Sequence, residues 1–227
     1  MKTFAIIPAG GKGLRSGHTA PKQYLRVQGK ELIAYTLEIF QTSKYINSIV
    51  VACEPSYFNL IQKLKKKYNF SKIINVVEGG KERQHSVFNA LSSLYADKND
   101  LVIVHDAARP LLPSNVLSNA IKQAKKKGNA LTCIKARDTL MKGDDTVKVY
   151  LKRDDIYYVQ TPQIFRFVDL MAAMQSARKA KFIGTDESML VKKIGQKVNI
   201  VEGSPYNFKV TTKTDLELFK SIVKNSA

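Results

Sequence analysis

The sequence predicts an α/β fold in which a mostly parallel sheet carries helices on both faces. Short apolar runs alternate with amphipathic segments along nearly the whole chain, which is typical of βαβ units. The run 101–105 is apolar without alternation, as expected for a strand buried on both faces. A glycine-rich segment follows the first apolar run, at the point where open α/β sheets bind ligands.

The expected elements follow from these periodicities. Strands are expected at 4–8, 48–53, 73–77, 101–105, 130–136, 198–201 and 208–210. Helices are expected at 31–42, 57–68, 87–94, 114–127, 166–179 and 188–194, with a last helix that opens at 212–215. Ser114 or Asn115 is the expected N-cap of the helix that Gly128 ends, and 212–215 resembles a capping box.

The alternation is interrupted at residues 138–159. Two β-rich arms flank Gly143 and Asp144, a moderate hairpin signal. Such a hairpin has no core face of its own, so we expect it to pack on a second subunit. We otherwise expect one domain over residues 1–227, with this β-arm inserted in it.

The formal net charge of +18 raises the alternative of a nucleic-acid-binding protein. Its distribution argues against this, because the lysines gather at the ends of expected helices, where solvent and the helix dipole accommodate them. The arginines concentrate in the motifs described below. The cysteines, Cys53 and Cys133, lie in apolar runs, as buried thiols do in a reducing compartment. No segment predicts a membrane helix or a signal peptide, so we expect a cytoplasmic protein with neither a membrane nor a nucleic-acid partner.

The segment PAGGKGLRSG follows the first strand. Its glycines let the backbone approach a phosphate closely and direct N–H groups toward it. It is not a P-loop, because no Ser or Thr follows Lys12, and it is not a dinucleotide fingerprint, because position 16 is serine. Arg15 and Lys22, which opens PKQYL, would place two cations over this site.

Further polar motifs follow later strands. GGKERQHSV contains Ser86, which either caps the next helix or bonds a ligand. VHDAARPLL contains Asp106, suited to a sugar hydroxyl or to Mg²⁺ beside phosphates, although a structural pair with Arg109 is the alternative. QTPQIF suggests a structural corner, and TDES suggests either a helix cap or a substrate contact. Lys209, on an expected apolar strand in NFKVTT, requires a nearby anion unless it lies at an edge.

Taken together in this order, these motifs and ARDTL resemble the 2-C-methyl-D-erythritol 4-phosphate cytidylyltransferases of non-mevalonate isoprenoid biosynthesis. The similarity covers residues 4 to about 216. It implies a Rossmann-like fold, Mg²⁺ or another divalent cation, and a homodimer in which each hairpin reaches the other subunit's site. It also implies transfer of CMP from CTP to methylerythritol phosphate, with release of pyrophosphate. Ribitol 5-phosphate is the alternative acceptor, and a catalytically silent nucleotide sensor is a further alternative.

The resemblance also assigns roles to residues. Arg15 and Lys22 would hold the triphosphate and stabilise the transition state, with Lys209 and Asp106 completing the catalytic group and Asp106 supporting the metal only indirectly or weakly. The CTP site would comprise Pro8, Ala9, Gly10, Gly11, Gly80, Lys81 and Ser86. The acceptor phosphate would be fixed by Asp106, Arg109, Thr139, Thr185 and Lys209, and by Arg153 from the partner's arm. The sequence departs from the family pattern at Gly10, at Ser16 and at residues 157–158. None of these differences removes a charged group.

Overall fold

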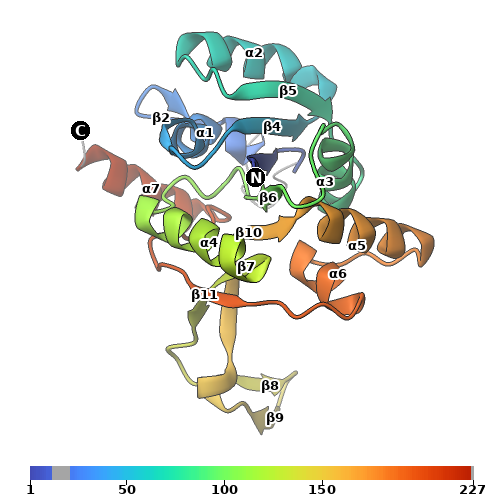
Figure 1. Cartoon of the computed structure of the whole chain (residues 1–227). Helices are drawn as coiled ribbons and strands as arrows, with labels where there is room; N and C mark the ends of the chain where they lie inside the picture. The colour runs from blue at the N-terminus through green and yellow to red at the C-terminus, as the bar shows by residue number, and fades with distance from the viewer. Residues whose placement is uncertain (12–20, 226–227) are drawn as a thin grey trace.

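The computed structural model describes residues 1–11 and 21–225. One seven-stranded sheet forms its centre, in the order β11-β7-β10-β6-β1-β4-β5 (Figure 1). Its strands are β1 (Thr3–Pro8), β4 (Ser48–Cys53), β5 (Ile73–Glu78), β6 (Leu101–Val104), β7 (Asn129–Lys135), β10 (Tyr157–Arg166) and β11 (Ile200–Glu202). Every pairing is parallel except those of β10, which runs antiparallel to both neighbours. The predicted mostly parallel α/β sheet is therefore confirmed.

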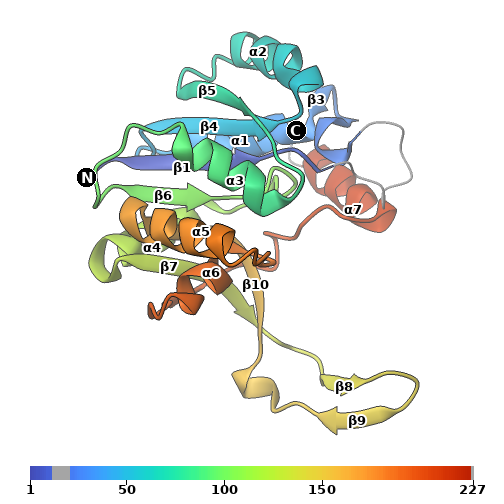
Figure 2. The same cartoon turned by 90° about the vertical axis from the view of Figure 1, so that its right-hand side faces the viewer.

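Helices cover both faces of this sheet (Figure 2). On one face lie α1 (Leu32–Thr42), α2 (Phe58–Lys67) and α4 (Ser114–Lys127). On the other lie α3 (Arg83–Ser92), α5 (Phe167–Lys179) and α6 (Glu187–Lys193). The last helix, α7 (Lys213–Lys224), packs against α1 through Phe219, whose ring meets Tyr35 edge to face. None of the helices in the described ranges is long and apolar enough to cross a bilayer.

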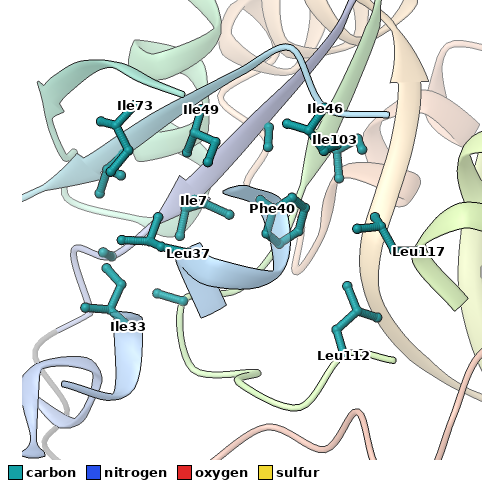
Figure 3. Packing of buried hydrophobic residues seen from close by; sticks show 14 of the residues in the cluster. Ile7, Ile33, Leu37, Phe40, Ile46, Ile49, Ile73, Ile103, Leu112 and Leu117 are labelled. Carbon is teal, nitrogen blue, oxygen red and sulfur yellow. The ribbon is translucent and has the colours of Figure 1, made fainter. Parts of the chain in front are cut away.

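The alternation of side chains along β1 explains its central position. Ala5 and Ile7 enter the core on the α1 side, and Phe4 and Ile6 enter the core on the α3 side. Figure 3 shows Ile7 packed with Leu37 and Phe40 of α1. Because the strand is buried on both faces, its carboxyl end is held rigidly, and the glycine-rich segment begins there.

The helix ends test the predicted caps. Gly128 ends α4 with a φ of 85°, as expected for a left-handed C-cap glycine. The capping box of α7 forms between Thr212 and Asp215. The N-cap of α4 is Pro113, so the assignment to Ser114 or Asn115 was wrong, because the fixed φ of proline already supplies the helix entry.

Two segments depart from the predicted elements. QTPQIF is no corner but the second half of β10, where the ladder shifts register between Val159 and Gln163 beside Pro162. A register shift lets a central strand accommodate a residue that has no N–H. Residues 208–210 form no strand; the nitrogen of Val210 donates to the oxygen of Ala108 instead (2.8 Å).

The predicted hairpin is present. Its paired strands are β8 (Met141–Gly143) and β9 (Val147–Tyr150), shorter than the predicted 138–159, because residues 157–159 already belong to β10. In both views it projects away from the sheet (Figures 1 and 2). Val147, Val149 and Tyr150 are at least half exposed on it. An apolar surface of this kind suits an interface, and its role in dimerisation remains a prediction.

The remaining elements are short. A small separate ladder joins β2 (Arg26–Val27) to β3 (Lys30–Glu31), and single 3₁₀ turns form η2 (Lys22–Tyr24), η3 (Pro55–Tyr57) and η4 (Arg153–Asp155).

Candidate active site

The loops that follow β1, β4, β5 and β6 leave the sheet at one edge, because these strands are adjacent and parallel. The start of the glycine-rich segment, at residues 8–11, therefore meets the GGKERQHSV and DAARP motifs there. Arg15, one of the two cations predicted over the phosphate site, lies outside the described residues. The other motif residues can be placed individually.

The start of the glycine-rich segment is tied to the PKQYL motif. The carbonyl of Ala9 accepts hydrogen bonds from Gln23 Nε2 (2.7 Å) and Tyr24 Oη (3.0 Å). Gln23 Nε2 also donates to the carbonyl of Gly11 (2.8 Å). Both side chains are buried. Since these carbonyls are bound from within the protein, the backbone of residues 9–11 is fixed before any ligand arrives.

Ser86 connects this loop to the next motif. Its hydroxyl accepts from the nitrogen of Gly80 (3.0 Å) and would lie 3.4 Å from a Cβ at Gly10. Glu82, not Ser86, caps α3, in a box with His85. The capping alternative for Ser86 was therefore wrong. The hydroxyl faces the contact between two glycine-rich loops, where glycine leaves the backbone accessible to a ligand.

Asp106 lies at the centre of a charged cluster. Its Oδ1 accepts from Arg83 Nε (2.9 Å), and its Oδ2 contacts Lys209 Nζ at 2.9 Å and Arg109 Nε at 3.5 Å. Arg83 also binds both carboxylate oxygens of Glu187, at 2.7 and 2.8 Å. The structure thus brings the predicted trio of Asp106, Arg109 and Lys209 together.

The electrostatics of this cluster favour the ionised form of Asp106, whereas burial raises the pKa of Glu187 and lowers that of Arg109. Burial alone would raise the pKa of Asp106, but Arg83, Lys209 and Arg109 hold it well below its ordinary value. Three cationic side chains surround the two carboxylates of Asp106 and Glu187, so the cluster keeps an excess positive charge. Lys209 is 40% exposed and supplies the accessible part of that charge. The cluster can therefore attract a phosphate.

The backbone of the DAARP loop is fixed by His105. Thr161 Oγ1 accepts from the nitrogen of Asp106 (3.1 Å) and lies 3.1 Å from His105 Nδ1, and His105 Nε2 lies 3.2 Å from the carbonyl of Arg109. A carbonyl only accepts, so the imidazole proton is on Nε2 and Nδ1 accepts from the threonine. His105 is fully buried. A buried ring with both nitrogens engaged in hydrogen bonds has a local structural role rather than that of a base.

A pH dependence follows from His105. Burial lowers its pKa from 6.5 to about 4, so the unfolded chain takes up a proton before the native protein does. Stability conferred by the neutral ring is complete above pH 6.5 and falls as the pH drops toward 4. Between pH 7 and 5 we expect the wild type to lose about 2 kcal/mol more of its unfolding free energy than His105→Gln. Urea unfolding at both pH values measures this, and equal losses would contradict a neutral buried histidine.

Lys22 lies toward the beginning of α7. Burial would raise the pKa of Asp215, but hydrogen bonds from the backbone of Thr212 and Thr211, together with the charge of Lys22, hold it below its ordinary value. Thr211 Oγ1 in turn donates to the carbonyl of Lys209 (3.0 Å). The Lys22 and Lys209 motifs are therefore brought to the same region, although residues 160 or more apart in sequence supply them.

Arg109 makes a further contact within the cluster, whereas the predicted acceptor residues Thr139, Arg153 and Thr185 lie further out. Arg109 Nη1 donates to the carbonyl of Asn207 (2.6 Å), two residues before Lys209 in sequence. Thr185 is exposed, and its hydroxyl contacts Met189 Sδ. Thr139 and Arg153 lie on the arm, where Arg153 Nη1 donates to the carbonyl of Arg137 (3.2 Å). The structure of the single chain does not bring these arm residues to Asp106.

Three residues of the cluster were not predicted. Arg83 was noted only as part of a motif, and Glu187 only as part of a helix cap. Asn207, whose Nδ2 donates to the carbonyl of Thr161 (2.7 Å), received no role. A buried carboxylate and an arginine 104 residues apart leave no local pattern. The only available signal was the concentration of arginines in motifs that follow strands.

Comparisons with known proteins agree on one family. The family model described as 2-C-methyl-D-erythritol 4-phosphate cytidylyltransferase matches residues 3–225. A protein of that name from Lysinibacillus sphaericus is 36% identical over 228 residues, covering 100% of this chain and 98% of its own length. Another from Thermotoga neapolitana is 40% identical over 220 residues, covering 97% and 96%. The crystal structure of the Francisella tularensis protein of that name aligns with a TM-score of 0.82 and 31% identity, covering 97% and 99%.

Proposed function

Because the chain belongs to the 2-C-methyl-D-erythritol 4-phosphate cytidylyltransferase family, we propose that the Asp106 cluster and the glycine-rich loops together transfer CMP from CTP to methylerythritol phosphate. The reaction serves isoprenoid biosynthesis and releases pyrophosphate. The observation that carries the assignment of the site is the single cationic region that joins Arg83, Arg109 and Lys209 around Asp106 at the ligand-binding edge of the sheet.

The proposed step is an in-line displacement. A phosphate oxygen of methylerythritol phosphate attacks the α-phosphorus of CTP, its new bond to phosphorus forms, and the bond to the pyrophosphate oxygen breaks. The attacking oxygen is already anionic, so no side chain needs to remove a proton from it. The difficulty is the approach of two polyanions, which preorganised cations relieve.

Each part of the site has a proposed role. The backbone of Pro8, Ala9, Gly10 and Gly11 would bind CTP, together with Gly80, Lys81 and Ser86. Arg15 and Lys22 would stabilise the negative charge of the transition state. Asp106 would accept a hydrogen bond from a hydroxyl of the polyol and would hold Lys209 and Arg109 in place. Arg109 and Thr185 would bind the acceptor phosphate.

The arrangement around Asp106 does not suit direct binding of Mg²⁺. Both of its oxygens already contact cationic side chains, and a metal ion there would meet a region of excess positive charge. Within the described ranges no group of three or more His, Cys, Asp or Glu side chains could hold a metal ion. We therefore propose that a divalent cation enters with the triphosphate of CTP, and that Asp106 affects it only indirectly.

We also propose that the active enzyme is a homodimer. The arm of each subunit would place its Arg153 and Thr139 in the active site of the other subunit. The arm carries apolar surface and projects away from the sheet of its own chain. Free cysteines fit a cytoplasmic enzyme.

The shared site gives a subunit-mixing prediction. Arg153→Ala and Lys22→Ala homodimers should each be nearly inactive, whereas the mixed dimer should regain about half the wild-type activity. One of its sites then combines an intact Lys22 with an intact Arg153 from the other subunit. Differently tagged subunits, co-expressed and purified in tandem, allow the measurement. A mixed dimer no more active than the parents would show that Arg153 does not serve the partner's site.

The function itself is tested by pyrophosphate release. We expect release only with CTP among the four ribonucleoside triphosphates, and only when methylerythritol phosphate is present. Ribitol 5-phosphate is the control acceptor. Equal or faster turnover with ribitol 5-phosphate would reassign the acceptor, and release without either acceptor would point to hydrolysis.

A further inference from the structure

A cavity of about 570 Å³ lies between α3, α5 and the segment that follows α5. Its volume is within the range of about 300 to 1,000 Å³ that holds small molecules in proteins. We propose that this cavity binds a small organic anion with an apolar body, and that its occupant alters the binding of CTP. The second part rests on the proposed role of the GGKERQHSV motif in the CTP site.

The interior of the cavity is apolar. Phe88 of α3, Met174 and Ala177 of α5, and Phe182 beyond α5 line it. Met174 and Ala177 are buried parts of the core on that face, and the two phenylalanine rings are partly exposed. Such a lining favours an aromatic or branched aliphatic body, because burying it removes apolar surface from water on both sides.

The rim of the cavity is cationic. Lys81, Arg178 and Lys181 line it, and none of the residues that line it carries a carboxylate. The guanidinium of Arg178 lies 5.5 Å from the ring centre of Phe88, which holds a charged donor beside the apolar interior. A carboxylate, sulfonate or phosphate on the occupant would find donors there. A neutral occupant would leave these cations uncompensated.

The cavity is connected to the catalytic region through Gln84. Its Nε2 donates to the carbonyl of Phe182 (3.1 Å), and its Oε1 accepts from the nitrogen of Gly184 (2.8 Å). Gly184 precedes Thr185 directly, and Arg83, next to Gln84, holds Asp106. An occupant that displaces the 182–184 segment therefore acts on residues of the proposed active site.

A second connection runs through Gly80. It lines the cavity, and its nitrogen donates to Ser86, which faces Gly10. A Cβ at Gly80 would lie 2.2 Å from the Cβ of His85, so the loop has no spare room at this point. Movement of Lys81 on binding an anion would pass directly to this loop.

The probe for the test is 8-anilinonaphthalene-1-sulfonate, an aromatic anion that fluoresces in apolar sites. N-phenyl-1-naphthylamine, which lacks the sulfonate, is its neutral counterpart. We expect saturable binding of the anion to the wild type. The double variant Arg178→Glu/Lys181→Glu should lower the affinity for the anion at least ~10-fold, because this is the effect of losing one good charge-assisted contact. Lys179→Glu/Lys192→Glu makes the same change in net charge on exposed residues that do not line the cavity, and should change it less than ~2-fold.

Location is tested with single tryptophans, because the chain has none. Ile183→Trp places one at the cavity, and Tyr150→Trp places one on the distant arm. Energy transfer to the bound probe should be strong from position 183 and weak from position 150. Saturating CTP should leave the probe bound, and the probe should change the apparent KM for CTP at least ~2-fold in the wild type but not in Arg178→Glu/Lys181→Glu.

The outcomes separate the parts of the proposal. Equal binding of the neutral counterpart, or equal loss in both double variants, would overturn an anion site. Full displacement by CTP would place the probe in the catalytic cleft and overturn a separate site. Binding with an unchanged KM would overturn the coupling alone. Since binding is read without turnover, it is independent of whether the proposed reaction is correct.

Discussion

Replacing Asp106 with asparagine is expected to destabilise the protein by about 3–5 kcal/mol, because removing one partner of a buried ion pair leaves the other uncompensated. Asparagine keeps the shape of the side chain but removes the charge that Arg83, Arg109 and Lys209 share. Turnover should fall as well, since Lys209 and Arg109 lose the group that orients them. Urea unfolding at neutral pH and pyrophosphate release measure the two effects.

Glu217→Gln is the matched control for Asp106. Glu217 pairs with Lys220 on the exposed side of α7 (2.8 Å), so its loss should cost less than about 1 kcal/mol. If Asp106→Asn were as stable as this control, the cluster would contribute nothing to folding. Normal turnover in Asp106→Asn would remove it from the site.

Replacing Lys22 with alanine is expected to lower kcat by about 10²-fold or more, the usual effect of removing one preorganised donor at a developing charge. Lys22 is half-buried near Asp215, in the region that Lys209 also reaches through Thr211. We expect the change to act mainly on kcat, because a group that meets charge formed in the transition state contributes little to ground-state binding.

Lys63→Ala is the control for Lys22, since Lys63 is an exposed lysine of α2. It should leave kcat within ~2-fold of the wild type. Near-normal turnover in Lys22→Ala would refute its assigned role. A fall in thermal stability without a change in kcat would assign Lys22 to the folding of the 209–215 segment instead.

Much of the fold could be predicted because its signals are local. Short apolar runs between amphipathic segments located the parallel strands, Gly128 marked the end of α4, and the 212–215 box marked the start of α7. β10 was missed in part because Pro162 normally interrupts a central strand, and only the register shift beside it reveals how the sheet accommodates it. Residues 208–210 have strand composition but bond to the DAARP loop through Val210.

The site was predictable where a motif carries its own chemistry. Asp106 and Lys209 were expected near an anion or cation from their positions, and they meet at 2.9 Å. The hydrogen bonds of Arg83 to Glu187 and of Gln23 to Ala9 depend on the tertiary structure, so no local sequence pattern predicts them. The roles of the arm residues depend on a second subunit and stay predictions.

β10 gives the protein a mechanical property of its own. The strand that leaves the arm enters the sheet between β6 and β7, and Thr161, within its register shift, bonds both the nitrogen of Asp106 and the ring of His105. The same strand, β10, therefore leads into the projecting hairpin and helps to position Asp106. If the hairpin binds a second subunit, as proposed above, one strand links that interface to the loop that carries Asp106, and we expect dimer formation to affect turnover.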